Sequence, residues 1–465
     1  MAMVERLEVT LSLTIAGATL AIESAGIVEL ALDLRSYGFT GSLAFVVPSD
    51  RDVLLPRFLG PDLIEVALTV GAAALDTPAV ESSRPIAVTG LVTEKAVSEG
   101  ALRRYTIAFA DPAQVLWTQH FPCQLYTDRS MAEVIDEQRG DRIAITYDSR
   151  TLAARQRQIF LHLPRRAGAS FWDFLTWYLD DCISVLTYDH AAARYQVSDA
   201  EPAPGSPIAL FREDVATVEL HAPAVPRHET RVLNAYADSP RTDHVANAQA
   251  ATGICSDVLV TTTLAHEVDE RVMREHARLI VPGPVLHLTF ARWPMQPLVP
   301  GATLELSVAN QWSRDLPIVE RPWRARRLRL RAAITHPPHD AVATYQVELD
   351  ADLEHVDDPQ PDRPPYRAPH YPGLVEGHVR GAVGDDGRLT YQVQPDDDTG
   401  LDEYQVTVPL WDDQLVRAPF EPLLGCDGCP PVGAARVLLA LGLHDARIVR
   451  PLAWQPGARR PVERP

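Results

Sequence analysis

The sequence predicts a mainly β fold with a smaller α+β insert. Short runs in which apolar and polar residues alternate make up most of the chain, and a period of two is typical of half-buried strands. Two helical segments with capping signals lie together in residues 121–204. A proline-rich stretch at 356–373 then separates a C-terminal unit from the rest of the chain.

Length and composition limit the class of protein. The chain has 465 residues, of which 46% are hydrophobic and 23% charged, which is typical of a folded protein with more than one domain. The formal net charge of −19 argues against nucleic acid as the main partner, because phosphate binding needs a basic surface. The arginine-rich stretch 321–331 is a local exception.

Cysteine usage and the N-terminus indicate where the chain is made. The five cysteines are scattered and odd in number, so we expect free thiols and synthesis in the cytoplasm. We expect no signal peptide. Residues 7–22 are apolar, but their period of two indicates a half-buried strand and not a membrane span.

Residues 1–120 are expected to form an antiparallel β domain. Gly, Pro and Asp interrupt short alternating runs throughout this region. The segment RRYTIAFADP at 103–112 is typical, since Tyr105, Ile107 and Phe109 would lie on one face of a strand.

Residues 121–204 are expected to form the α+β element. Ser130 precedes a helix and Glu133 follows three residues later, which is typical of a capping box. Ser170 and Asp173 repeat this arrangement before a second helix. Burying a large apolar side chain contributes about 2 kcal/mol, against about 1 kcal/mol for a cap, so packing fixes the second helix. Its apolar stripe consists of Phe171, Phe174, Leu175, Tyr178, Leu179, Cys182 and Ile183.

The remaining segments follow in order. Residues 205–355 are expected to return to strands, with one helix at 266–279. Proline is so dense at 356–373 that we expect a stiff, extended linker. Strand-like runs at 374–454, separated by Gly, Asp and Pro, favour a small barrel of five strands. The tail at 455–465 is rich in proline and arginine.

No catalytic or metal-binding motif in the sequence is complete, and we expect no cofactor. HEVDE at 266–270 begins like a zinc-protease helix, but Glu270 stands where a second histidine is needed. Cys426 and Cys429 supply half of a structural zinc site, which normally has four ligands; a metal or disulfide role for this pair stays an alternative. The acidic run at 395–403 lacks the spacing of a calcium loop, so we expect a solvated turn.

Six stretches of the sequence occur in a characteristic order. They are FPCQLYTDRSMAEVIDE (121–137), RRAGASFWDFLTWYLDDCISVLTYDH (165–190), VPGPVLHLT (281–289), LVPGATLEL (298–306), YPGLVEGHVRG (371–381) and PPVGAARVLLALGLHDARIVRPLAW (430–454). This ordered set resembles the VgrG-like spike proteins of type VI secretion and the related baseplate hub proteins of contractile phage tails and extracellular contractile injection systems. No single stretch is diagnostic, and the resemblance covers nearly the whole chain.

The resemblance implies an architecture. It implies a first hub β-barrel domain at 1–120 and a second at 205–355, with the α+β element at 121–204 packed beside them. It also implies an OB-fold barrel at 374–454 beyond the linker at 356–373. In this arrangement the second helix is well marked because its stripe packs on a β domain, and no catalytic residue is needed to explain it.

The resemblance also implies a function. It implies a non-enzymatic homotrimer that caps the inner tube of a contractile injection apparatus, adapts the sixfold tube to a threefold spike, and carries a tip or cargo. The implied partners are a tube protein of the Hcp type, baseplate wedge proteins, and a tip or effector protein, with no nucleic acid. We expect synthesis in the cytoplasm, assembly into the particle, and delivery to or through a target cell envelope. Any needle would be short or supplied by another chain, with residues 455–465 as a tether or socket.

Two other functions stay open. A tail-associated cell-wall-degrading enzyme would need two carboxylates in a cleft, one with a raised pKa, or a complete metal site. An OB-fold module that binds oligonucleotides or sugars is the second alternative. The acidic charge and the lack of a basic and aromatic strand face in 371–454 argue against nucleic acid as its ligand.

Overall fold

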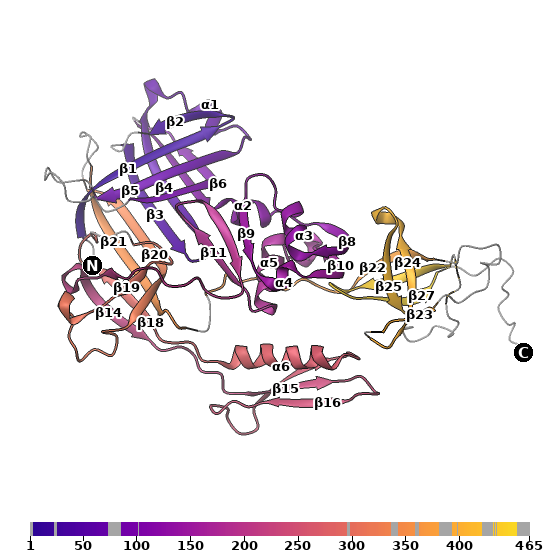
Figure 1. Cartoon of the computed structure of the whole chain (residues 1–465). Coiled ribbons are helices and arrows are strands. Elements are labelled where there is room, and N and C mark those ends of the chain that lie inside the picture. The colour runs from indigo at the N-terminus through magenta and orange to yellow at the C-terminus, as the bar shows by residue number, and fades with distance from the viewer. Residues whose placement is uncertain are drawn as a thin grey trace, which may run out of the picture.

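The structure of the chain is a computed structural model. It describes residues 3–22, 26–72, 85–100, 102–294, 298–335, 343–358, 362–380, 393–397, 399–420, 431, 433 and 435–452. Strands predominate, and the predicted α+β segment follows the first seven strands, so the mainly β class is confirmed. A body of long strands lies at one end, the α+β segment lies in the middle, and a smaller sheet lies at the other end (Figure 1).

Eight antiparallel strands form a closed ring of hydrogen-bonded neighbours, which we call the ring. Its order is β3-β4-β7-β6-β5-β1-β21-β20, and β20 pairs again with β3. Alternate side chains of the first strand, from Leu7 to Ile15, are buried, which confirms the period-two strand predicted at 7–22 as far as Ile15; a turn at 16–17 then leads into a second strand. The ring strands are β1 (Met3–Ile15), β3 (Ile27–Arg35), β4 (Gly38–Pro48), β5 (Ile64–Ala72), β6 (Ile86–Ser98), β7 (Leu102–Ala110), β20 (Pro322–Ile334) and β21 (Ala343–His355).

Two small elements are attached to the ring. The short strand β2 (Ala18–Ile22) forms a hairpin with β1. The one-turn helix α1 (Leu55–Phe58) places Phe58 edge-on against Tyr105, with ring centroids 4.8 Å apart. Phe58 is fully buried, so this helix covers part of the ring core.

The long hairpin β20–β21 links the ring to further strands of the same sheet. One half of each strand pairs within the ring, while the other half joins the order β13-β19-β20-β21-β18-β14. Each strand has 13 residues, which is long enough to pair with both sets of strands. The strands expected as separate domains at 1–120 and 205–355 are therefore hydrogen-bonded in one 13-stranded sheet. The added strands are β13 (Ile208–Ala209), β14 (Val215–His221), β18 (Val285–Phe290) and β19 (Thr303–Glu305).

The α+β segment contains both predicted helices with their capping boxes. In the first box, Ser130 Oγ accepts from Glu133 N (3.2 Å). In the second, Ser170 Oγ accepts from Asp173 N (3.3 Å). The hairpin predicted after the second helix is also present. The elements are α2 (Pro112–Trp117), β8 (Cys123–Ser130), α3 (Met131–Gln138), β9 (Ala144–Asp148), α4 (Arg150–Ala153), β10 (Arg155–His162), α5 (Phe171–Asp181), β11 (Val185–Asp189) and β12 (Arg194–Ser198).

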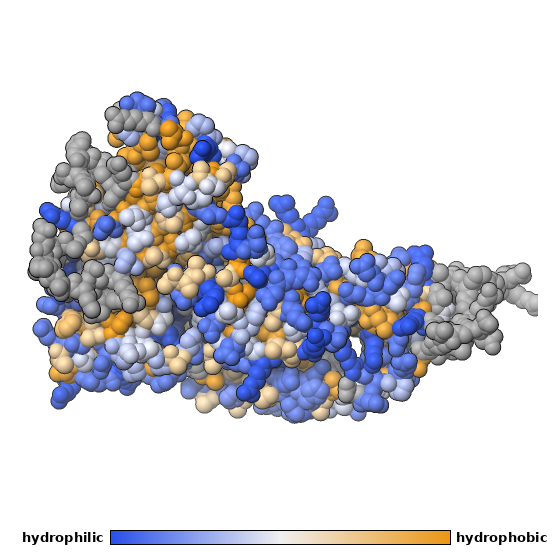
Figure 2. Space-filling view, turned by 45° about the horizontal axis from the view of Figure 1, so that its top comes forward, coloured by the Kyte–Doolittle hydropathy of each residue, from blue (hydrophilic) through white to orange (hydrophobic). Residues whose placement is uncertain are grey.

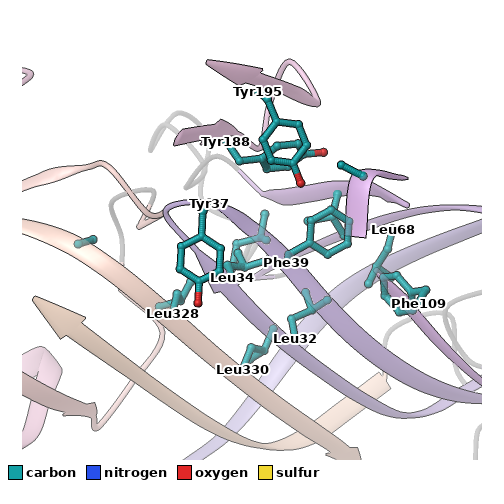
Figure 3. Packing of buried hydrophobic residues seen from close by; sticks show 14 of the residues in the cluster. Leu32, Leu34, Tyr37, Phe39, Leu68, Phe109, Tyr188, Tyr195, Leu328 and Leu330 are labelled. Atoms are coloured by element: carbon teal, nitrogen blue, oxygen red, sulfur yellow. The ribbon is translucent and has the colours of Figure 1, made fainter. Parts of the chain in front are cut away.

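The stripe of α5 is buried up to Leu179, as the spacing predicts, but the helix ends at Asp181, so Cys182 and Ile183 lie beyond it and are half-buried. Phe171, Phe174, Leu175 and Leu179 are each 2% exposed or less. The following hairpin packs on the ring: Tyr188 lies beside Phe39 of β4 with ring centroids 6.0 Å apart, and the tilted ring of Tyr195 lies against Tyr188 (Figure 3). The ring and the α+β segment therefore share one continuous apolar core.

Residues 222–284 leave the main sheet between two neighbouring strands, β14 and β18, and form a separate arm. The arm contains β15 (Glu229–Asn234), β16 (Arg241–Val245), β17 (Cys255–Val260) and α6 (Ala265–Leu279). Its sheet has the order β16-β15-β17, and α6 packs on it. The helix predicted at 266–279 is confirmed, whereas its small sheet had no separate signal in the sequence.

Residues 362–372 are extended and carry the chain from the body to the C-terminal sheet; we call them the strap. In the C-terminal sheet, β22 pairs with β24 and β26, β25 pairs with β24, and a bridge between Phe420 and Ile448 joins the β25 end to β27. Its strands are β22 (Gly373–Val379), β23 (Val393–Pro395), β24 (Asp402–Val408), β25 (Gln414–Pro419), β26 (Arg436–Leu441) and β27 (Ala446–Pro451). Short 3-10 turns are η2 (Ser49–Arg51), η3 (Arg165–Ala167), η4 (Arg212–Asp214), η5 (Val308–Asn310) and η6 (Pro409–Trp411).

Candidate functional site

The junction between the body and the C-terminal sheet is the candidate functional site, because it sets how the two ends of the molecule are joined. Strand β10 supplies most of its polar contacts. The Phe160 amide donates to the Leu443 carbonyl (2.9 Å), and Gln158 Nε2 donates to the Asp445 carbonyl (2.7 Å). At the end of the strap, the Tyr371 hydroxyl donates to the Phe160 carbonyl (2.8 Å). Backbone and side chain thus both join these units.

Apolar packing reinforces the junction. Leu125 of β8 and Phe160 of β10 are fully buried, and they belong to the core of the C-terminal sheet and not to that of the ring. The Phe160 ring meets Trp411 edge-on, with centroids 5.5 Å apart. A Cβ at Gly373 would lie 2.7 Å from the same ring, so this close approach requires glycine. The C-terminal sheet therefore shares a core with part of the α+β segment.

One acidic residue of the run at 395–403 is part of the junction. We expected a solvated turn, but the Asp396 side chain is 4% exposed and pairs with Arg157 of β10 (2.9 Å). This arginine is the main reason that the pKa of Asp396 falls to about 2. Thr399 Oγ1 also donates to Asp396 (2.8 Å). The prediction was wrong at Asp396 because the partner lies far away in the sequence.

Asp111 fixes the ring to the α+β segment. Its carboxylate caps α2 by accepting from Gln114 N (3.0 Å), and it also accepts from Phe39 N (3.2 Å) and the Tyr195 hydroxyl. Complete burial outweighs these donors and raises the pKa of Asp111 to about 6. Burial alone accounts for the raised pKa of Asp111, so the shift does not point to a catalytic role.

A buried pair of glutamates meets one requirement of the enzyme alternative. Burial, followed by repulsion from Glu201, raises the pKa of Glu354 to about 7. Arg324 lies between the two acids, 3.1 Å from Glu201 and 3.7 Å from Glu354. Glu354 is only 3% exposed. The glutamate with the raised pKa, Glu354, therefore does not line the groove that Glu201 lines beside β9.

The arginine-rich stretch 321–331 is largely neutralised by carboxylates. Arg327 makes a bidentate pair with Asp33 of the neighbouring strand (2.6 Å for both bonds), and Arg329 contacts Asp352 (3.2 Å). Arg326 pairs with Asp362 at the start of the strap (2.5 Å). Arg327 and Arg329 therefore stabilise the shared hairpin through cross-strand pairs, and Arg326 joins it to the strap.

The candidate metal residues remain apart or undescribed. Cys426 and Cys429 lie outside the described residues. Within the described ranges, no group of three or more His, Cys, Asp or Glu side chains could hold a metal ion. In the HEVDE segment, His266 is exposed, and Glu270 pairs with Arg274 (3.3 Å) on the same helix. Among the described helices, none has the length and apolar character that crossing a membrane requires.

Apolar surface gathers over the ring, whereas the rest of the same face is mostly hydrophilic (Figure 2). Near α1, Val53 is 72% exposed and Leu59 is 63% exposed. Leu102, which is paired with Pro48 at the start of β7, is 46% exposed. Exposed apolar side chains that lie close together are typical of a surface that contacts other proteins.

Comparisons with known proteins find similarity in structure only. No family model and no curated protein matches the sequence. A chain of the Francisella PdpA–VgrG complex in its half-lidded form aligns with 98% of this chain and 80% of its own, with a TM-score of 0.77 and 14% identity. The chain has the fold of VgrG-like spike and hub proteins.

Two further solved structures share parts of this spike and hub fold. The E. coli c3393 protein, described as a type VI secretion component similar to the T4 tail proteins gp27 and gp5, aligns with 94% of this chain and 98% of its own, with a TM-score of 0.52 and 12% identity. A tail protein from Neisseria meningitidis aligns with 77% of this chain and 99% of its own, with a TM-score of 0.50 and 11% identity. The resemblance found in the ordered sequence stretches is confirmed at the level of fold.

Proposed function

We propose that the chain is a non-enzymatic structural hub of a contractile injection apparatus. In this proposal three copies cap the inner tube, adapt its sixfold symmetry to a threefold spike, and carry a tip or cargo. The observation that supports it most is the alignment of 98% of the chain with a chain of the PdpA–VgrG complex at a TM-score of 0.77. An enzyme domain added to a hub would leave part of the chain without a structural counterpart.

The proposed partners follow from the same likeness and from the surface. A tube protein of the Hcp type, baseplate wedge proteins, and a tip or effector protein are the expected neighbours. The exposed apolar residues Val53, Leu59 and Leu102 favour protein contacts at the α1 end of the ring. The tail at 455–465, outside the described residues, is proposed to tether or receive the tip. We propose that the chain is made in the cytoplasm, assembled into the particle, and delivered to or through a target cell envelope.

The junction supports a mechanical role for the molecule. A spike transmits force from the tube to its tip, so the tip-bearing unit must not swing freely on a linker. Here β10 and the strap join the C-terminal sheet to the body through hydrogen bonds, an ion pair and a shared core. Glu354 does not favour the enzyme alternative, because it is buried, pairs with Arg324, and does not line the groove that Glu201 lines.

Binding to the tube tests the proposal. The purified chain is mixed with assembled tubes of an Hcp-type protein from the same organism and examined by negative-stain electron microscopy. We expect density at one end of each tube, and none when the chain carries Phe174→Asp, which disrupts the α+β core. Tubes without bound chain, together with hydrolysis of purified peptidoglycan by the chain, would contradict the proposal.

A further inference from the structure

Two adjacent carboxylates at the end of α5 hold together parts of the chain that are far apart in sequence. Asp180 and Asp181 occupy the last turn, where the helix dipole disfavours negative charge. Cationic side chains from α6 and from the strap approach them. The pairs are Arg274–Asp181 (2.8 Å), Arg271–Asp181 (3.6 Å), Arg278–Asp180 (3.6 Å), Arg278–Asp181 (3.6 Å) and Arg363–Asp180 (2.7 Å).

The two carboxylates divide their partners. Asp181 faces α6, whose three arginines recur at spacings of three and four and therefore lie on one side of the helix. Asp180 mainly holds the strap: besides Arg363, it accepts from the Tyr366 hydroxyl (2.7 Å). Glu270 and Glu275 on α6 also pair with these arginines, so the cluster contains four carboxylates and four arginines.

The arm has few buried apolar side chains, and these do not pack on the body. Its buried apolar residues, Val232, Val245 and Val268, belong to none of the larger apolar clusters among the described residues. Hydrogen bonds instead hold the arm together internally: Asn234 Nδ2 donates to the Thr262 carbonyl (3.0 Å), and the Thr262 amide donates to Asn234 Oδ1 (3.1 Å). The arm is thus built as a small unit beside the main core.

The ion pairs at Asp181 are accessible to solvent and ions. The Asp181 side chain is 29% exposed and that of Arg274 is 31% exposed. Charges this exposed are screened by salt, whereas buried apolar contacts are not. The strap contrasts with this arrangement, because Arg363 is more buried and the uncharged Tyr366 hydroxyl adds a hydrogen bond to Asp180.

We propose that Asp181 latches the arm, residues 222–284, to α5 and that the arm can move away from α5 when this latch opens. Asp180 holds the strap whether the latch is closed or open. Loss of the Asp181 pairs lets the arm swing on its two connections to β14 and β18 while its own fold stays intact. Release would free the arginine side of α6 for the acidic surface of a partner protein. The C-terminal sheet would stay fixed to the body throughout.

A distance measurement tests the latch. Spin-labelled non-canonical residues replace Met273 on α6 and Leu374 on β22, both exposed, so that the native cysteines stay in place; Leu374 lies away from the two connections on which the arm would swing. Double electron–electron resonance then reports the distance between the arm and the C-terminal sheet, which stays fixed to the body. We expect one narrow distance at about 0.01 M salt, and a second, longer distance for most molecules at about 1 M, where the screening length falls from about 30 Å to about 3 Å.

Charge reversals separate the latch from a general loss of folding. Asp181→Arg should give the longer distance even at low salt, and the exchange Asp181→Arg with Arg274→Asp should restore the short one. Asp269→Arg breaks the Arg241–Asp269 pair (2.7 Å) within the arm and serves as the matched control, for which we expect no change. One short distance at high salt and in Asp181→Arg would overturn the proposal. A broad distribution in the native chain at low salt would do so as well.

Discussion

Replacing Phe160 with alanine should loosen the C-terminal sheet from the body. The Phe160 ring is fully buried between the α+β segment and the C-terminal sheet, against Trp411 and below Gly373. Phe→Ala in a core costs about 3–5 kcal/mol, through lost apolar burial and the cavity that remains. The Phe160 backbone bond to Leu443 persists in the variant, so we expect a value near 3 kcal/mol, which is the lower end of this range.

Hydrogen exchange shows which strands lose stability in Phe160→Ala. A cost of about 3 kcal/mol corresponds to about a hundredfold faster opening. We expect that increase in β22, β24 and β26, with little change in the ring strands. Phe45→Ala is the matched control, since Phe45 is equally buried and stacks on Tyr105 in the ring at 5.1 Å. That variant should raise exchange in the ring strands instead.

Two results of the exchange measurement would refute this reasoning. If Phe160→Ala raises exchange throughout the chain by the same factor, body and C-terminal sheet unfold as one unit. If exchange in the C-terminal strands does not change, the polar contacts alone hold the junction. Either result would remove the shared core as the cause of the rigid connection.

Three other predictions concern stability. Phe174→Asp or Leu179→Asp should prevent folding of the α+β segment, because an unpaired charge in the core costs several kcal/mol; soluble variants with a native melting temperature would contradict this. Glu354 has a pKa raised from 4.5 to about 7, so the folded state retains a proton that the unfolded state releases, and stability falls as pH rises from about 4.5 to 7. In urea unfolding, the free energy of unfolding of Glu354→Gln should therefore exceed that of the native chain by up to about 3 kcal/mol at pH 8 and should equal it at pH 4. An equal gain at both pH values would refute the raised pKa of Glu354. The double variant Cys426→Ser, Cys429→Ser should keep its melting temperature, and zinc found by elemental analysis with unfolding on chelation would show a metal role.

Elements defined by local signals could be predicted from the sequence. The capping boxes at Ser130 and Ser170 and the stripe of α5 depend on residues a few positions apart, and all were located correctly. The α6 helix was found for the same reason. Closure of the ring could not be predicted, because β20 and β21 pair with strands about three hundred residues earlier, for instance Leu330 with Leu32.

The junction was missed for a related reason. Strand β10 begins RQRQ, which looks like a fully solvated strand, yet Gln158 is 4% exposed and Arg157 pairs with Asp396. Polar side chains give no sign in the sequence that a distant chain segment satisfies them. The glycine at 373 was a usable signal, since it begins a strand and permits the close approach of Phe160.

The central claim is that this chain works as a trimeric hub, and the mass of the assembled protein tests it most directly. Native mass spectrometry of the purified chain at micromolar concentration should give three times the 51.2 kDa monomer. The trimer should persist on dilution, because sheet edges and apolar surface near α1 would be covered by neighbouring copies. A stable monomer under these conditions, which remains monomeric when the tube protein is added, would contradict the account.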